Sequence, residues 1–317
     1  MSTLTKPLLV LLGPTASGKS ALALHLAEKL AGEILVCDST QVYRHFDIGT
    51  AKPTAAERVR VPHHLLDLCE PDEDFTAGDY LRLGRAALGD ISARGRLPMV
   101  VAGTGLYLRA LLEGLSPLPS RSPELRSRLQ ACAEEEGSGY LHKLLARVDP
   151  ASAKEIASQD TPKLVRALEV FFVARRPRAE LFREGRQPLE GYTVEKIGLL
   201  PDRQQLYQRI EARVDSMLAA GWLEETRRLR EHFGDAVKPF GFLGYKQLAA
   251  HLRGEASLEE ALEEIKQETR NFAKRQLTWF RHESGVTWLA GFGNHREIQA
   301  DALTRMRAEV DRAARNR

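Results

Sequence analysis

Residues 8–20 read LLVLLGPTASGKS. The apolar residues that open this stretch form an unbroken run, which is typical of a strand buried on both faces of a parallel sheet. The residues that follow fit the pattern G-x-x-x-x-G-K-[ST], in which the glycines let backbone N–H groups turn inward around phosphate oxygens. A helix that begins near Lys19 adds the positive end of its dipole. The stretch therefore predicts a phosphate-binding loop between a buried strand and a helix.

Short apolar runs and helical patterns alternate beyond this loop. Further apolar runs lie at 34–36 and 99–102, and leucines recur at helical spacing over 20–31 until Gly32, which we interpret as the helix stop. The first two strands and their helix make a βαβ unit with a right-handed crossover. Strand-like runs return at 194–200 and 286–289. We predict an α/β fold whose core is a P-loop-type parallel sheet covered by helices.

The middle of the chain has a different character. Over 122–190 strand signals largely vanish, charged helical patterns dominate, and a basic stretch runs from Arg175 to Arg186. We predict that 122–190 forms an inserted, mostly helical domain, with 1–121 as the first part of the core and 191–317 as the return to the core plus C-terminal helices. Those helices are predicted at 203–220, 223–232 and 258–281, with the aromatic residues of 240–245 in a loop between them.

The composition narrows the class of protein. A hydrophobic fraction of 43% with 28% charged residues is enough for a sizeable core, and no apolar run approaches the roughly 18–20 residues that span a bilayer. The three cysteines, Cys37, Cys69 and Cys132, are too far apart for a zinc or redox pair, so we expect reduced thiols in a cytoplasmic protein with no membrane segment. A net charge of +3 neither requires nor excludes a nucleic-acid partner.

The loop alone does not say what becomes of the phosphate. ATP-hydrolysing P-loop proteins usually carry a Mg²⁺-binding aspartate after a second strand, but the run at 99–102 is followed by Gly103-Thr104-Gly105. The run at 34–36 leads to Asp38, where amide and aromatic side chains follow that suit a nucleobase at least as well as a metal. A P-loop kinase acting on a small molecule or nucleotide remains the alternative. A non-catalytic RNA-binding protein is disfavoured by the intact Lys19 and Ser20.

Motifs along most of the chain resemble those of bacterial tRNA dimethylallyltransferases, also called tRNA isopentenyl transferases. They are, in order, GPTASGKS at 13–20, DSTQVY at 38–43, HHLLD at 63–67, AGTGLY at 102–107, RALEV at 166–170, GYKQ at 244–247 and AKRQLTWFR at 273–281. The resemblance implies transfer of a dimethylallyl group from dimethylallyl diphosphate to N6 of adenosine 37 in the tRNA anticodon stem-loop, with Mg²⁺ assisting. We expect a monomer.

The resemblance also implies roles at the reacting centre. Asp38 would accept a proton from the adenine amine, Thr104 would form a hydrogen bond there, and Lys19 would offset the charge of the departing diphosphate. Ser20 would ligate the Mg²⁺. Arg209 lies on the same helix face as Arg213, which the resemblance makes the more secure diphosphate ligand. The diphosphate-binding residues would be Gly13, Pro14, Thr15, Ala16, Ser17, Gly18, Lys19, Ser20 and Arg213.

Contacts with tRNA are expected from the loop at 38–41, from the helical insertion at 122–190, which would face the tRNA with its basic stretch from Arg175 to Arg186, and from the helix at 258–281. Single-stranded bases are read by edge hydrogen bonds and stacking, and phosphates by basic side chains. Lys266, Arg270 and Lys274 repeat at helical spacing, which we interpret as a phosphate-contacting stripe. The tRNA-binding residues would be Asp38, Ser39, Thr40, Gln41, Thr104, Arg126, Pro162, Lys163, Leu164, Val165, Arg166, Lys274 and Arg275.

Overall fold

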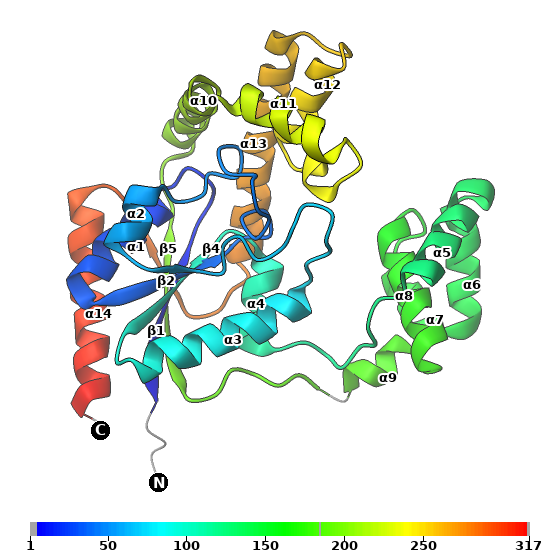
Figure 1. The fold of residues 1–317 in the computed structure, drawn as a ribbon. Helices are drawn as coiled ribbons and strands as arrows, with labels where there is room; N and C mark the ends of the chain where they lie inside the picture. The colour runs from blue at the N-terminus through cyan, green and yellow to red at the C-terminus, as the bar shows by residue number, and fades with distance from the viewer. Residues whose placement is uncertain (1–4, 184, 316–317) are drawn as a thin grey trace. The chain divides into compact units, whose positions relative to one another are not determined.

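The core of the protein is a parallel β-sheet. The computed structural model describes residues 5–183 and 185–315, and within them one six-stranded sheet has the order β3-β2-β4-β1-β5-β6 (Figure 1). Every pair of neighbouring strands is parallel, so the predicted fold class is confirmed. The strands are β1 Lys6–Leu12, β2 Gly32–Cys37, β3 His63–His64, β4 Leu97–Ala102, β5 Tyr192–Leu199 and β6 Val286–Leu289. The two-residue β3 was not predicted, because it is too short to show a pattern.

The unbroken apolar run places β1 at the centre of the sheet. Residues 8–12 are fully buried, and β1 pairs with β4 on one side and β5 on the other. Helices α1 (Lys19–Leu30) and α14 (Arg296–Arg315) pack on one face, while α3 (Ala77–Ala93) packs on β2 and β4 (Figure 1). Gly32 does not end the helix as predicted but opens β2, where a Cβ would lie 2.6 Å from Cε of Met99.

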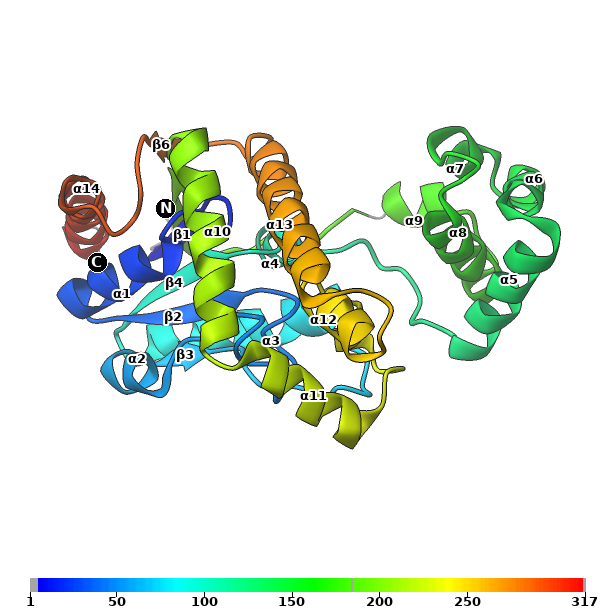
Figure 2. The ribbon, with the colours of Figure 1, turned by 90° about the horizontal axis from the view of Figure 1, so that it is seen from above.

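The C-terminal helices gather at the carboxyl ends of the strands. They are α10 Arg203–Ala219, α11 Trp222–Phe233, α12 Tyr245–Leu252 and α13 Leu258–Phe280, and Figure 2 shows α10 and α13 side by side. The prediction of a loop through Tyr245 was wrong, because Tyr245 begins α12. Its ring is fully buried against Phe46 and Trp222, so tertiary packing stabilises a helix that is too short to be recognised by its periodicity.

A buried carboxylate holds the loop that follows β2. Glu225 of α11 is 3% exposed and accepts hydrogen bonds from the backbone N–H groups of Asp47, Ile48 and Gly49 and from the Tyr245 hydroxyl. A Cβ on Gly49 would lie 2.1 Å from Nε1 of Trp222, so only glycine lets the loop approach this closely. The loop is thus fixed by side chains from α11 and α12. The remaining elements of this part are α2 Ala55–Arg60, α4 Gly105–Glu113 and a 3-10 turn at Lys238–Gly241.

Residues 112–188 form a separate compact unit, whereas the predicted insertion covered 122–190. Its helices are α5 Pro123–Glu136, α6 Ser138–Val148, α7 Pro150–Glu155, α8 Thr161–Ala174 and α9 Arg178–Arg183. They enclose their own core, which includes Leu141, Leu145 and Leu168. The unit begins earlier than predicted because its entering and leaving segments touch: a Cβ on Gly114 would lie 2.3 Å from the carbonyl oxygen of Gln187.

Among the described residues, no helix has both the length and the apolar character needed to cross a membrane.

Replacing Glu225 should destabilise the protein strongly. We expect Glu225→Ala to lower the free energy of unfolding by about 2–4 kcal/mol, because it leaves several buried N–H groups and a hydroxyl without their acceptor. Glu231→Ala, at an exposed position on the same helix, should change it by no more than about 0.5 kcal/mol. Urea denaturation measures both values, and equal effects of the two substitutions would contradict the role of Glu225.

Candidate active site

The phosphate-binding loop joins β1 to α1 in a strained, inward-turning conformation. Gly13, Ala16 and Gly18 have φ angles of +141°, +61° and +88°, in the region that turns successive N–H groups toward one point. A second glycine-rich loop, between β6 and α14, packs against the phosphate-binding loop. The N–H of Gly293 donates to the carbonyl oxygen of Ser17 at 2.9 Å, and a Cβ on Gly18 would lie 2.9 Å from the Gly293 nitrogen. This support was not predicted from the sequence, where Gly291 and Gly293 are its local signal.

Lys19 lies inside the loop. Its Nζ donates to the carbonyl oxygens of Gly13 and Pro14, both at 2.8 Å. Burial and, to a smaller extent, the positive charge of Arg213 lower the pKa of Lys19 to about 7, although the negative charge of Asp38 acts in the opposite direction. A bound diphosphate would stabilise the charged form of this lysine.

Asp38 follows β2 and is fixed by its own loop. Its Oδ1 accepts hydrogen bonds from the backbone N–H of Thr40 at 2.8 Å and from the Thr40 hydroxyl at 2.6 Å. Its Oδ2 lies so close to Gly103 that a Cβ there would be 2.4 Å away. Gly103 therefore has to be glycine for the carboxylate to keep this position.

Thr104 connects the loops that follow β4 and β2. Its Oγ1 accepts a hydrogen bond from the backbone N–H of Ser39 at 2.9 Å and lies 3.2 Å from Oγ of Ser39. The N–H groups of Gly103 and Thr104 both donate to the carbonyl oxygen of Cys37 at 2.9 Å. Thr104 and Asp38 are thus held next to each other, as expected for residues that follow neighbouring parallel strands.

Gln41 has a fixed side-chain orientation. Its Nε2 donates to the carbonyl oxygens of Thr50 at 3.0 Å and Ala51 at 3.4 Å. Because both partners are acceptors, the nitrogen must face them and the amide oxygen is left to accept a hydrogen bond from a ligand.

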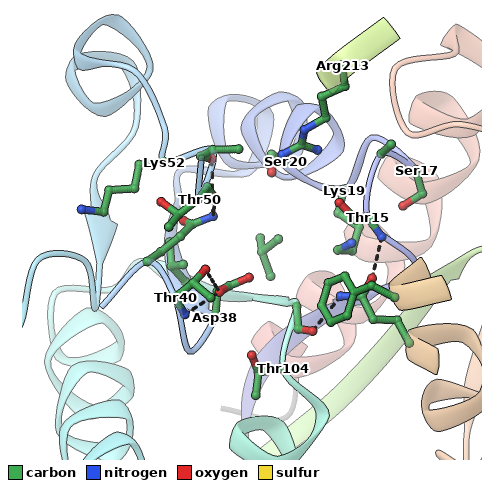
Figure 3. A pocket seen from close by; sticks show the side chains of 18 of the residues that line it. Thr15, Ser17, Lys19, Ser20, Asp38, Thr40, Thr50, Lys52, Thr104 and Arg213 are labelled. Atoms are coloured by element: carbon green, nitrogen blue, oxygen red, sulfur yellow. Dashed lines mark hydrogen bonds between the residues drawn. The ribbon is translucent and has the colours of Figure 1, made fainter. Parts of the chain in front are cut away.

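The two arginines of α10 have different surroundings. Arg213 points into the site (Figure 3), where burial lowers its pKa and the negative charge of Asp38 opposes that effect. Arg209 instead lies over the Phe292 ring, 3.8 Å from its centre, and donates to Oδ1 of Asn294 at 2.8 Å. The structure therefore favours Arg213 as the anion ligand and gives Arg209 a part in holding the loop between β6 and α14.

These groups surround a single cavity of about 760 Å³. Figure 3 shows Asp38 and Thr40 across the cavity from Lys19, with Arg213 and Ser20 at another side and Thr104 nearby. The rest of the lining is largely apolar and includes Val101, Leu106, Val214, Met217, Leu243, Phe272 and Trp279. One cavity therefore offers a cationic region, a carboxylate and an apolar wall.

The predicted basic stripe of α13 is only partly at the surface. Lys266 forms an ion pair with Asp215 at 2.9 Å and Arg270 with Glu211 at 2.5 Å, so both hold α13 against α10. Lys274 and Arg275 are exposed, and Arg275 lines the cavity. The interpretation of a continuous phosphate-contacting stripe was wrong in its first half, because acidic partners on another helix are not visible in the pattern of α13.

The tRNA-binding residues predicted in the helical unit include both exposed and buried side chains. Pro162 and Lys163 are exposed at the start of α8, but Leu164 and Val165 are 0% and 1% exposed in the core of the unit. Only the backbone of these two residues is left for a ligand, so any tRNA contact by them has to be made through backbone groups. In the same unit, Arg126 and Arg166 both form ion pairs with the fully buried Glu169, at 3.2 and 2.6 Å.

The Ser20 hydroxyl is the candidate ligand for a metal ion shared with a phosphate. Across 5–183 and 185–315, no group of three or more His, Cys, Asp or Glu side chains is placed to hold a metal ion. Ser20 is exposed at the first turn of α1 and lines the cavity beside Lys19. A hydroxyl here suits Mg²⁺, which keeps several waters and takes further oxygen ligands from a phosphate.

Comparisons with known proteins agree with this arrangement. Family models described as "IPP transferase" and "Isopentenyl transferase" match residues 41–283 and 6–66. A tRNA dimethylallyltransferase of Solibacter usitatus is 52% identical over 95% of this chain and 98% of its own length, and one of Koribacter versatilis is 50% identical with the same coverage.

Solved structures give the same result. The full-length tRNA isopentenylpyrophosphate transferase of Bacillus halodurans matches with a TM-score of 0.72 and 34% identity over 98% of both chains. A eukaryotic dimethylallyltransferase acting on tRNA matches with a TM-score of 0.81 and 28% identity, over 96% of this chain and 78% of its own. Matches that extend along nearly the whole chain in sequence and in structure show that it belongs to the tRNA dimethylallyltransferase family.

Proposed function

We propose that the protein transfers the dimethylallyl group of dimethylallyl diphosphate to N6 of adenosine 37 in tRNA and releases diphosphate. The observation that carries the proposal is the placement of Asp38 and Lys19 across one cavity from each other (Figure 3). A prenyl transfer needs both ends of this arrangement. A proton acceptor must face the amine, and a cationic site must hold the departing diphosphate.

The phosphate loop stabilises the leaving group. As the C–O bond of the donor breaks, its electron pair adds negative charge to the diphosphate. The inward N–H groups of the loop, Lys19 and Arg213 are fixed around that charge, so little reorganisation is needed when it develops. Mg²⁺ held by Ser20 and the diphosphate oxygens would supply further charge neutralisation.

Asp38 acts on the nucleophile. The exocyclic amine of adenine is a weak nucleophile, because its lone pair is delocalised into the ring. As the new bond forms between N6 and the first carbon of the prenyl group, one N6 proton passes to Asp38 and then to solvent. The Oε1 of Gln41 is available to accept a hydrogen bond from the same base, and the apolar wall suits the hydrocarbon chain of the donor.

The substrate tRNA approaches the open side of this cavity. The adenine has to leave its stack to reach a buried donor, and the exposed Lys274 and Arg275 on α13 supply charge for the flanking phosphates. In the helical unit, the exposed Pro162 and Lys163 are the residues proposed to contact tRNA. We also propose a monomeric enzyme in the cytoplasm, where the three free cysteines would stay reduced.

The direct test is a prenylation assay. Purified protein with Mg²⁺ and radiolabelled dimethylallyl diphosphate should label a tRNA with adenosine at position 37, and should not label the same tRNA carrying guanosine there. Unlabelled tRNA, together with ATP consumption and a phosphorylated small molecule, would replace the proposal with a P-loop kinase.

Asp38→Asn should remove most of the turnover. The substitution keeps the size of the side chain but abolishes its capacity to accept a proton, so we expect kcat to fall by about 10²–10⁴-fold. The dissociation constant for tRNA should stay within about threefold of the unchanged protein, measured by filter binding, because the base keeps its other contacts. Equal losses in tRNA affinity and in kcat would contradict the role of Asp38 as proton acceptor.

Diphosphate binding should depend on the protonation of Lys19. With a pKa of about 7, Lys19 loses its charge in the free protein as the pH rises above 7, and a bound diphosphate restores it. Affinity should therefore fall by up to about tenfold per pH unit above 7, with proton uptake on binding. Calorimetry at pH 8 in two buffers of different ionisation enthalpy measures this uptake. Lys19→Met controls for the titration of diphosphate itself, and an equal proton uptake by that variant would refute the prediction.

A further inference from the structure

Gln276 of α13 joins two loops that the reaction uses. Its Oε1 accepts a hydrogen bond from the backbone N–H of Thr15 at 2.7 Å, and its Nε2 donates to the carbonyl oxygen of Gly103 at 2.8 Å. The side chain is 6% exposed, so both contacts are shielded from water. A single amide thus connects the phosphate loop after β1 with the loop after β4.

Each of these contacts lies next to a reacting group. Thr15 belongs to the loop that would surround the diphosphate, and its N–H is directed to Gln276 rather than to the phosphate site. Gly103 is the residue against which Oδ2 of Asp38 rests, and Thr104 follows it directly. A shift of the Gly103 carbonyl would therefore move the carboxylate that faces the amine.

The position of Gln276 on α13 adds a second connection. The exposed Lys274 and Arg275 precede it directly, and Phe272 and Trp279 of the same helix line the cavity. Lys266 and Arg270 hold α13 to α10, the helix that carries Arg213. A tRNA contact that shifts α13 would therefore also shift both loops, because Gln276 binds each of them.

We propose that Gln276 is a positioning residue that sets the separation between the diphosphate loop and the Asp38–Thr104 loop. Its amide oxygen fixes the diphosphate loop, and its amide nitrogen fixes the loop that positions Asp38. The diphosphate site and the proton acceptor therefore keep fixed positions relative to α13. The expected effect on catalysis rests on the proposed prenyl transfer, whereas the connection between the two loops is independent of the reaction.

The catalytic test uses two substitutions and a control on the same helix. Gln276→Met has a similar length and removes both hydrogen bonds, whereas Gln276→Glu keeps the acceptor for Thr15 and loses the donor to Gly103. Misplacing reacting groups by about 1 Å costs on the order of 10²-fold in rate, so we expect kcat to fall by up to about that factor in both variants. The KM for dimethylallyl diphosphate should change by no more than about threefold. Gln267→Ala, at an exposed position, should leave kcat unchanged.

A double variant tests whether Gln276 acts through Asp38. In Asp38→Asn combined with Gln276→Met, the loss of kcat should be smaller than the product of the two single losses, because one part of the effect is shared. Multiplied losses, or an unchanged kcat in Gln276→Met, would overturn the positioning role while the unchanged protein still prenylates tRNA.

Hydrogen exchange measures the connection itself without any turnover. We expect Gln276→Met to speed amide exchange in peptides that cover 13–18 and 102–107, and Gln267→Ala to leave both unchanged. Unaltered exchange in either peptide would overturn the inference, even for a protein whose activity proved to be different. A loss of exchange protection throughout the chain would also refute it, since Gln276 would then be a general stability residue.

Discussion

The site depends on one constraint: a loop whose N–H groups converge on an anion must also be held by other segments of the chain, because contacts within the loop satisfy only some of its polar groups. The carbonyl oxygen of Ser17 is bound by Gly293, from the loop between β6 and α14. The N–H of Thr15 is bound by Gln276, from α13. Lys19 is held by the carbonyl oxygens of Gly13 and Pro14. Segments from the far end of the chain therefore shape a loop near its beginning, which explains why the family resemblance extends so far beyond the loop.

Sheet topology brings the reacting groups together. The phosphate loop follows β1, Asp38 follows β2 and Thr104 follows β4, and these strands are neighbours in the order β2-β4-β1. In a parallel sheet the carboxyl ends of neighbouring strands lie at one edge, so groups from three separate places in the sequence meet there. Helices α10 and α13 then complete the cavity with Arg213 and with apolar side chains. The cavity is therefore a property of strand order and of two later helices, and not of any single motif.

Local patterns in the sequence predicted the local structures well. The apolar runs that became β1, β2, β4, β5 and β6 and the periodic segments that became α10, α11 and α13 were recognisable, because each has a strong period or an unbroken core face. Pairings between distant residues were not. Partners that lie far away in the sequence determine these features, and no local pattern identifies them. They are the ion pairs of Lys266 and Arg270, the two contacts of Gln276 and the burial of Leu164 and Val165. Helix α12 was missed for the same reason, since Trp222 and Phe46 stabilise its first residue from elsewhere.

The contact between Gly114 and Gln187 has a consequence for how such proteins change over time. The chain leaves the α/β part and comes back to it at nearly the same point, and the helical unit encloses a core of its own. Residues in that unit can be replaced, lengthened or shortened without altering the register of any strand. Under the tRNA contacts proposed for Pro162 and Lys163, variation in RNA preference could accumulate in the inserted helices while the chemistry of the cavity stays intact, and exchanging the whole insertion between relatives would be a route to altered RNA preference.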